Sequence, residues 1–531
     1  MSVEINEKRL SATEILESQS SLENGTIDAF LDDNTEIETN DAVLAQKIHL
    51  INDAIDEIGF TWYHAKLFCI AGFGYSIDSQ MEMIQSAVKV YVDYQMWSGS
   101  FPLSNEIFSL GLITGSIVFG MGCDLVGRKV IFNSSVFLTS IFGFFTGGTS
   151  SYAMYCIFMF LSAMAAGGNL ATDVSVFLEY LPSKYQYLNT SMALFWGIGQ
   201  TIAAVISWAF IPNFSCSGKE YCPSSINRGW RYCWYVNSGI CFLAALFRVF
   251  VLKMDETPKF LIINGKDEEA FEVLKKIADK YNRPMSLTAE ELRACGEIKH
   301  DYFDLKKDGY SFKALLKAMW TNMKILFQTK IVARSTILVF LSWGFIGLAY
   351  STFYDFLYIF IATHGGDTGS SAYITYRNAT IANFVGIFGP IFAGWLILIK
   401  FKVFGKEITL GRKGTMVFGA LSSMAILFGY TTVRTPSGDA GFGAASYFFV
   451  NVYYGCLYAY TPEIFPTKAR GTGIGAALVV CRVFGAFDPV VYYFGSASAS
   501  VVPIWVCGAV IGSLALLAIL MPFEPSLKRT V

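Results

Sequence analysis

The amino-acid sequence predicts an all-α membrane protein in which twelve transmembrane helices form two pseudo-symmetric six-helix bundles. Apolar residues make up 53% of the 531-residue chain and charged residues only 15%, whereas a soluble domain carries about 25% charged residues. Apolar runs long enough to cross about 30 Å of hydrocarbon, about 20 residues each, recur twelve times, six on each side of one charged stretch. Sequence motifs also recur at equivalent places in the two sets, which favours a repeated half.

The chain begins with an acidic segment, residues 1–60, which holds fourteen Asp or Glu residues against three Lys or Arg. It lacks the basic start and apolar centre of a signal peptide, so we expect a solvated cytosolic tail. Apolar residues from Val43 to Ile58 recur at helical spacing. This pattern predicts a short amphipathic helix that leads into the membrane.

The two sets of spans define the expected domains. We expect an N-terminal bundle over 64–252, a cytosolic linker with short helices over 253–330, a C-terminal bundle over 331–521, and a cytosolic tail over 522–531. The predicted spans are, in order, 64–88, 103–122, 130–148, 152–178, 191–211, 230–252, 331–362, 373–399, 415–432, 444–461, 473–494 and 501–521.

Basic residues predict the orientation of the chain. Lys and Arg concentrate in alternate loops, and fifteen of them lie between residues 253 and 330. Loops rich in Lys and Arg remain in the cytosol, so both termini are expected there. We expect the plasma membrane, with the vacuole or another organelle membrane as the alternative.

Two cysteines flank a polar loop that this orientation places outside the cytosol. Cys216 and Cys222 are expected to form a disulfide there, although two free thiols are the alternative. Asn213 begins an Asn-Phe-Ser triplet and is a candidate glycosylation site, at a position close to the membrane.

The first predicted span carries two carboxylates. Asp78 and Glu82 lie one helical turn apart, on a face otherwise made of small and polar residues. A carboxylate inside a membrane helix costs about 2.5 to 3.5 kcal/mol on insertion scales, so both must face a cavity or an opposite charge. We take Asp78, Glu82 and Asp173, in the fourth span, as proton-coupling candidates. A buried ion pair that locks the halves together is the alternative for each.

The loop between the second and third spans carries a motif of glycines and charges. Asp124, Gly127, Arg128 and Lys129 follow the spacing G-x3-D-x2-G-R-K, in which glycine permits a tight turn and close helix approach. A shorter version, Gly-Arg-Lys with Arg412, stands in the equivalent loop six spans later. We expect these residues to contribute to gating, with plain cytosolic anchoring as the alternative.

Two helix ends also resemble each other. Glu179 closes the fourth span and Glu463 closes the tenth, each three residues before a proline. A glutamate at this place can bind an arginine of a neighbouring loop, such as Arg470, and hold a gate shut in one conformation. The alternative is a static salt bridge, but the recurrence in both halves favours a gate.

These motifs, together with Glu256-Thr257-Pro258-Lys259-Phe260-Leu261 after the sixth span, resemble the major facilitator superfamily. Within it the chain is most similar to the sugar-porter and synaptic-vesicle-protein-related branches, and Gly167-Gly168-Asn169 resembles an uncharacterised fungal group. The resemblance covers about residues 45 to 525. It implies a major facilitator fold and alternating access around a central site, without naming a substrate.

The chain departs from the family pattern at three places. Leu125 stands where the loop motif usually has a basic residue after the aspartate, and no arginine occurs early in the fourth span, where sugar porters carry one. Asn169 replaces the aspartate of phosphate-transporting relatives, which counts against inorganic phosphate.

Six residues in or near the spans are candidates for binding substrate. Arginines favour an anion such as a carboxylate, whereas aromatic and amide side chains favour a sugar or ring compound. The candidates are Arg482, Arg377, Gln200, Asn451, Tyr350 and Tyr454. If bundle packing turns the face of Asp78 and Glu82 inward, Arg482 becomes their partner across the cleft.

The sequence therefore predicts a secondary active transporter of a small polar metabolite, an organic anion or a sugar-like compound, coupled to protons by symport. An uncoupled facilitator and a transporter-like nutrient receptor are the alternatives. No nucleotide-binding loop is present in the sequence, which disfavours ATP-driven transport. We expect no enzyme activity, no cofactor or metal and no nucleic-acid partner, and we expect a monomer in the bilayer.

Overall fold

The structure is a computed structural model. It describes residues 42–97, 103–216, 218, 220–298, 312–364, 372–403, 406–433, 435–487, 502–522 and 524. The acidic tail before residue 42 and the predicted tail after residue 524 therefore lie outside the described residues.

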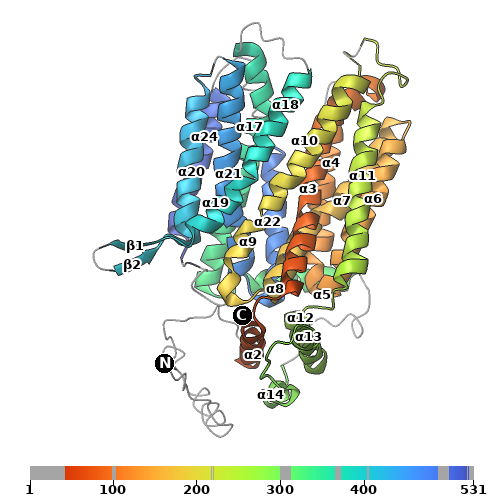
Figure 1. The fold of residues 1–531 in the computed structure, drawn as a ribbon. Helices are drawn as coiled ribbons and strands as arrows, with labels where there is room; N and C mark the ends of the chain where they lie inside the picture. Colours follow the sequence, from red (N-terminus) through yellow and green to blue (C-terminus); the bar gives the residue numbers. More distant parts are fainter. Residues whose placement is uncertain are drawn as a thin grey trace.

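Six membrane segments form the first half of the bundle (Figure 1). They are α3 (Trp62–Met96); α4 (Leu103–Gly115) with η2 (Ser116–Met121) and α5 (Cys123–Val126); α6 (Arg128–Gly148); α7 (Tyr152–Gly167) with α8 (Asn169–Tyr180); α9 (Tyr187–Ser191) with α10 (Leu194–Phe214); and α11 (Gly229–Phe247) with η4 (Arg248–Leu252). A short turn of 3-10 helix, η3 (Ser183–Tyr185), joins α8 to α9.

Six segments also form the second half, which stands beside the first in Figure 1. They are α17 (Lys330–His364); α18 (Ala372–Gly386) with α19 (Phe388–Leu396); α20 (Gly411–Tyr430); α21 (Pro436–Ile464); α22 (Arg470–Gly485), which η5 (Thr467–Ala469) precedes; and α24 (Val502–Leu520). Each of the twelve apolar runs predicted from the sequence therefore overlaps a helix in the part of the chain that the structure describes, whereas residues 488–494 of the eleventh run lie outside that part.

Length and hydropathy alone select seven helical segments of the described residues as candidate membrane spans. The first membrane helix, α3, is not among these seven, because polar and charged residues such as Asp78 and Glu82 lie along it. Its sequence is less apolar than that of its neighbours because part of its surface faces other helices and not lipid. The charged face of α3 positions the candidate site.

Short helices cover one end of the bundle, which we call the linker end. They are α2 (Ala42–Ile58), α12 (Pro258–Ile263), α13 (Asp267–Lys280), α14 (Ala289–Ala294) and α16 (Phe312–Ile325). The apolar face of α2, including Ile48, Ile51 and Ile55, is buried in one core with α12, α13 and α14. Lys47 of α2 also forms an ion pair with Asp267 of α13, at 2.6 Å. The amphipathic helix predicted before the first span thus packs on the linker helices.

A small β-hairpin projects sideways from the second half near the linker end (Figure 1). Its strands are β1 (Lys400–Val403) and β2 (Lys406–Thr409), paired antiparallel with Lys400 opposite Thr409. These strands were not predicted from the sequence, because each is only four residues long and the pair follows directly after a long apolar span. The backbone N–H of Leu410 donates to Ile399 at 3.0 Å and closes the base of the hairpin.

The opposite end of the bundle carries the loop between α10 and α11, so we call it the disulfide end. Cys216 and Cys222 are joined there in a disulfide, with their Cα atoms 5.3 Å apart. Asn213 lies exposed on the last turn of α10, and its amide donates to the backbone oxygen of Ala209 at 3.1 Å.

Candidate functional site

The guanidinium of Arg482 on α22 lies between two carboxylates of α3. Its Nη1 donates to Oε1 of Glu82 at 2.7 Å, and its Nη2 donates to Oδ2 of Asp78 at 3.3 Å. The two acids are four residues apart on one helix, so both can reach a single cation from the other half. The side chain of Asp78 is 2% exposed, that of Arg482 16% and that of Glu82 32%.

The charges at this site do not balance when both carboxylates are ionised. One guanidinium faces two carboxylates, and of the three side chains Asp78 is the one almost fully shielded from water, where an unpaired charge is costly. The Oδ1 atom of Asp78 is buried and has no hydrogen-bond partner among the described residues. A proton on one carboxylate would restore neutrality, and the free oxygen offers a bond to a further group.

Aromatic side chains from both halves pack together beside these charges. The centroid of Tyr458 lies 4.6 Å from that of Trp343 and 5.2 Å from that of Tyr75. Tyr75 is one turn before Asp78 on α3, so the aromatic group adjoins the carboxylates. The rings are those of Tyr75 and Trp196 from the first half and of Trp343, Tyr350, Tyr454 and Tyr458 from the second.

Gln200 and Tyr350 connect the halves within the same region. The Nε2 atom of Gln200 on α10 donates to the hydroxyl of Tyr350 on α17 at 2.8 Å. The ring of Tyr350 lies 5.5 Å from that of Tyr454. An added Cβ on Gly347 would overlap the backbone oxygen of Cys481, so α17 and α22 meet closely at the residue before Arg482 and one turn from Tyr350. We call the set of Asp78, Glu82, Gln200, Tyr350, Tyr454, Arg482 and the neighbouring rings the central site.

Two substrate-binding candidates lie elsewhere. Asn451 is buried on α21, where its amide donates to the backbone oxygen of Gly386 at 3.3 Å and joins α21 to α18. Arg377 is exposed on the second turn of α18, and its guanidinium contacts the neighbouring Asn378 at 3.2 Å. The structure thus places Asn451 in a contact between α21 and α18 and leaves Arg377 exposed on α18.

Asp173 belongs to a separate polar cluster inside the first half. Its Oδ2 accepts from Nη2 of Arg248 at 2.6 Å, and both side chains are buried. Asn169 accepts from the same guanidinium at 2.9 Å and donates to the backbone oxygen of Gly74 at 2.5 Å. A side chain at Gly74 would overlap Arg248. Sequence reasoning missed Arg248, although it is the only charge between residues 232 and 252.

The motif after the second span connects the two halves at the linker end. Asp124 accepts from the backbone N–H of Thr472 at 2.7 Å, from its hydroxyl at 2.9 Å, and from the backbone N–H of Gly471 at 3.2 Å. These three donors lie at the N-terminus of α22, where a carboxylate is stabilised by the helix dipole. Asp124 also lies 3.2 Å from Arg128.

Glu179 joins this network from α8. It lies 3.3 Å from Arg128 of its own half and 3.4 Å from Arg470 of the other half. Arg128 also donates across the halves to the backbone oxygen of Thr467 at 3.0 Å. All four charged side chains are at most 1% exposed. We call Asp124, Arg128, Glu179, Arg470 and Thr472 the linker-end network.

The second half carries a matching arrangement. Arg412 pairs with Glu463 at 2.6 Å, and Arg412 also donates to the backbone oxygen of Gln186 in the first half at 3.2 Å. Asn189 of α9 donates to the same carboxylate oxygen of Glu463 at 3.2 Å. The residues that echo each other in the sequence therefore occupy equivalent places on the two sides of the interface.

Each half also places a glutamate on the N-terminus of a membrane helix. Glu256 accepts from the backbone N–H groups of Arg128 and Lys129 at 3.0 and 3.2 Å, and Glu524 accepts from those of Arg412 and Lys413 at 2.9 and 3.0 Å. Burial raises the pKa of Glu256, against the opposing effects of Arg128 and the backbone donors. Sequence reasoning assigned no role to either glutamate.

Gly127 permits the turn that presents these N–H groups. Its φ of 111° is a conformation that side chains disfavour, and an added Cβ would lie 2.6 Å from Oε2 of Glu256. Lys129, by contrast, is exposed, and its Nζ lies 3.9 Å from Oδ1 of Asp255, at the long end for an ion pair. The motif therefore combines one conformational residue, two buried charges and one surface charge.

At the linker end, charged groups and helix N-termini of the two halves interlock. On the other side of Glu82, the hydroxyl of Tyr376 on α18 donates to the backbone oxygen of Ala87 on α3 at 2.9 Å, and the ring of Tyr373 lies 5.3 Å from that of Trp208 on α10. The central site thus lies between the linker-end network and these contacts of α18 with α3 and α10. Such an arrangement can bind a small molecule between two halves that rock against each other.

Comparison with known proteins places this geometry in a family. A sequence profile described as "Major Facilitator Superfamily" matches residues 67–489. The chain is 37% identical over 489 residues to "MFS siderochrome iron transporter 1" of Ceriporiopsis subvermispora, covering 91% of this chain and 92% of that one. It is 33% identical to an uncharacterized MFS-type transporter of Schizosaccharomyces pombe, covering 96% and 94%.

A solved structure shows the same fold. The proton:xylose symporter XylE, bound to 6-bromo-6-deoxy-D-glucose, superposes with a TM-score of 0.64 at 16% identity and covers 88% of this chain and 97% of its own. The predicted fold of twelve helices in two bundles and the resemblance to a fungal group of transporters are both confirmed. The chain belongs to the major facilitator superfamily, a family of membrane transporters and not of enzymes.

Proposed function

We propose that the protein is a proton-coupled symporter of a small organic anion that carries a carboxylate, working by alternating access. The observation that supports this proposal is the placement of Arg482 between Asp78 and Glu82 at the interface of the halves. An arginine is a bidentate partner for a carboxylate, and here it is occupied by the protein's own acids.

The proposed coupling follows from competition for Arg482. A proton that binds Asp78 or Glu82 weakens the hold of that acid on the guanidinium. The guanidinium can then bind the carboxylate of a substrate without adding net negative charge to a shielded site. The nearby rings of Tyr350 and Tyr454 would contact the remainder of the substrate. A proton and an anion therefore enter together.

Release toward the linker end requires that the linker-end network separates. The bonds from Thr472 to Asp124 and the pair of Arg470 with Glu179 cross the halves, so they must break as the halves rock. They would form again on return, which makes the buried charges a reversible gate.

The basic loops support a cytosolic position for the linker end, because Lys and Arg concentrate there. Transport toward that end would be import. We propose the plasma membrane, or alternatively the vacuole or another organelle membrane, and a monomer as the transporting unit. The transport domains would be residues 64–252 and 331–521, joined by the linker 253–330.

Purified protein in vesicles would test this function. Thermal-shift screening against carboxylates, sugars and vitamins first identifies a ligand, and uptake of that ligand is then measured with and without an inward proton gradient. The proposal expects a carboxylate, gradient-driven accumulation, and loss of the gradient effect in Asp78→Asn or Glu82→Gln.

The other outcomes would support other functions. Uptake that only equilibrates the ligand, with no effect of the gradient, would indicate an uncoupled facilitator. Binding without any uptake would indicate a transporter-like receptor. Binding of a neutral sugar and of no carboxylate would remove the proposed role of Arg482.

An iron chelate is a second candidate substrate. The relative named "MFS siderochrome iron transporter 1" is 37% identical over nearly the whole chain. Hydroxamate or carboxylate chelates of iron also present anionic oxygen atoms to an arginine. Ferric chelates therefore belong in the screen, and binding of such a chelate with no binding of simple carboxylates would favour this reading.

A further inference from the structure

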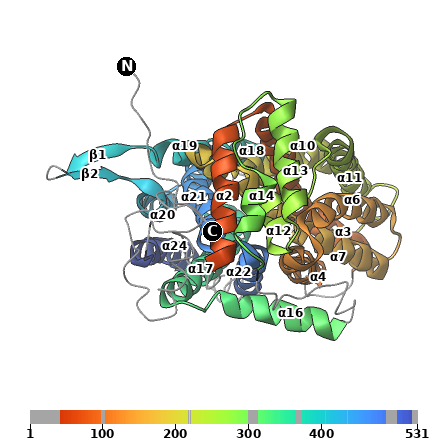
Figure 2. The same cartoon turned by 90° about the horizontal axis from the view of Figure 1, so that it is seen from below.

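Helix α16 lies across the end of the bundle, whereas the helix after it runs along the bundle axis. Figure 2 shows α16 lengthwise at the edge of the molecule, while α17 is seen nearly end-on. Only residues 326–329 separate the two helices. The first residues of α17 carry an exposed apolar side chain, Ile331, as expected where a span enters lipid. The position of α16 is therefore at the level of the membrane surface.

The exposed side of α16 combines large apolar and basic side chains. Trp320 is 63% exposed and Leu316 is 47% exposed. At about 100° per residue, these two lie within about 40° of each other on the helix, next to a group formed by Lys313, Lys317 and Lys324. All three lysines are exposed. Between residues 312 and 334 the chain holds five Lys or Arg and no Asp or Glu.

The other side of α16 packs on the gate. Ala318 and Asn322 are buried one turn apart on that side, and the helix contacts η5, α22 and α5. These elements supply Thr467, Arg470 and Asp124 of the closed linker end. Binding at the exposed face of α16 therefore affects residues that must move when the gate opens.

A partner that covers the exposed face of α16 must offer apolar groups to Trp320 and Leu316 and anionic groups to the lysines. A bilayer surface rich in anionic phospholipid has both properties at the depth where α16 lies. We propose that α16 binds the anionic headgroups of the leaflet at the linker end, with Trp320 and Leu316 at the acyl boundary and the three lysines on the phosphates. Because its inner face contacts η5 and α22, lipid binding holds the linker end closed.

Hydrogen exchange of the full-length protein in lipid nanodiscs tests this proposal. Discs of phosphatidylcholine are compared with discs that also contain about 30% phosphatidylserine. Amides of residues 312–325 are expected to exchange about tenfold more slowly in the anionic discs, since opening must then break the lysine contacts. Lys313→Gln combined with Lys317→Gln and Lys324→Gln is expected to abolish that difference.

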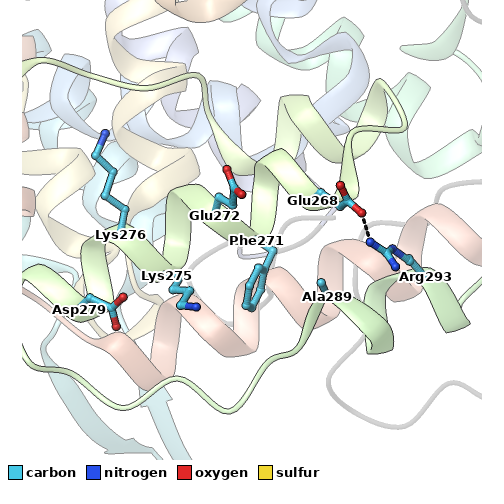
Figure 3. Close-up of a pocket in the computed structure, with 8 residues that line it drawn as sticks. All are labelled: Glu268, Phe271, Glu272, Lys275, Lys276, Asp279, Ala289 and Arg293. Atoms are coloured by element: carbon cyan, nitrogen blue, oxygen red, sulfur yellow. Dashed lines mark ion pairs between the residues drawn. The ribbon is translucent and has the colours of Figure 1, made fainter.

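A matched control removes the same number of charges from another linker helix. Lys275, Lys276 and Lys280 are exposed on α13, which lies farther from the bundle in Figure 1, and the first two are drawn in Figure 3. Their change to Gln is expected to leave the lipid effect on α16 intact. Equal loss in both triple variants would overturn the assignment to α16.

The comparison of wild-type protein in the two lipids requires no variant, so a folding defect cannot obscure it. Equal exchange of residues 312–325 in both discs would overturn the proposal. Protection that appears only in discs loaded with two copies would also overturn it, in favour of a contact between copies. Protection by phosphatidylserine in single-copy discs supports it.

Discussion

Arg482 and Glu82, 400 residues apart in the chain, form an ion pair of 2.7 Å that joins the two halves at the central site. The same guanidinium reaches Asp78 on the buried side. The first half thus supplies two acids and the second half the single base. The asymmetry has direct consequences for stability.

Removal of the base should cost more than removal of one acid. In Arg482→Gln, Asp78 and Glu82 are left as unpaired acids, and loss of one partner from a buried pair costs about 3 to 5 kcal/mol. Glu82→Gln leaves the pair with Asp78 and should cost under about 1 kcal/mol. Thermal unfolding at neutral pH measures both. Adding Asp78→Asn to Arg482→Gln should recover part of the loss, and an equal effect of the two single changes would contradict this account.

The linker-end network can be tested through a natural thiol. The side chain of Cys123 is buried and lies at the place where Gly471 of the other half approaches it. Glu179→Gln weakens the attraction between Arg128, Arg470 and α8, so the halves should separate more often. Maleimide labelling of Cys123, in a background with Cys69→Ser and Cys295→Ser that removes the two described free thiols that are not buried, is expected to rise about tenfold.

The control for this labelling is a change that leaves the gate intact. Lys129 is exposed and takes part in the gate only through its backbone, so Lys129→Gln should leave the labelling rate of Cys123 unchanged. Faster labelling in this variant, or none in Glu179→Gln, would argue for a static helix-end bridge.

The pair of Asp173 with Arg248 is expected to be structural. Asp173→Asn leaves a buried guanidinium without its acid and should lower stability by about 3 to 5 kcal/mol. Adding Arg248→Gln should restore part of that stability, because both charges are then gone. If Asp173 instead carries the transported proton, Asp173→Asn would abolish gradient-driven uptake, and the second change would not restore it. Thermal unfolding and vesicle uptake together separate the two roles.

Gly127 should be intolerant of a side chain. Its φ of 111° and the proximity of Glu256 mean that Gly127→Ala strains the turn, at a cost of about 1 to 3 kcal/mol. Gly239, on α11, has open space where a Cβ would lie, so Gly239→Ala is the matched control and should be neutral or slightly stabilising. A similar fall in unfolding temperature for both would exclude the conformational explanation.

The sequence was sufficient for the features that depend on local patterns. The length of apolar runs predicted, within the described residues, a helical segment for each of the twelve spans, and the repeated Glu-x-x-Pro ends predicted where Glu179 and Glu463 would lie. Features that depend on how a helix is rotated in the bundle were not accessible. Asn451 and Arg377 had suitable chemistry, but the structure places Asn451 in a contact with Gly386 and leaves Arg377 exposed beside Asn378. Arg248 on η4 pairs with Asp173 on α8 beside Gly74 of α3, a meeting that no spacing along the chain reveals.

The capping role of Glu524 extends the working unit beyond its last membrane helix. The final helix, α24, ends at Leu520, yet the carboxylate four residues later binds the start of α20. A protein shortened to Leu520 would retain every described helix of both bundles. It would, however, leave the backbone N–H groups of Arg412 and Lys413 without their acceptor, and the side chain of Arg412 is the partner of Glu463. Fusion tags and truncations for expression should therefore begin after Glu524. An earlier boundary would weaken one side of the interface while leaving the membrane topology unchanged.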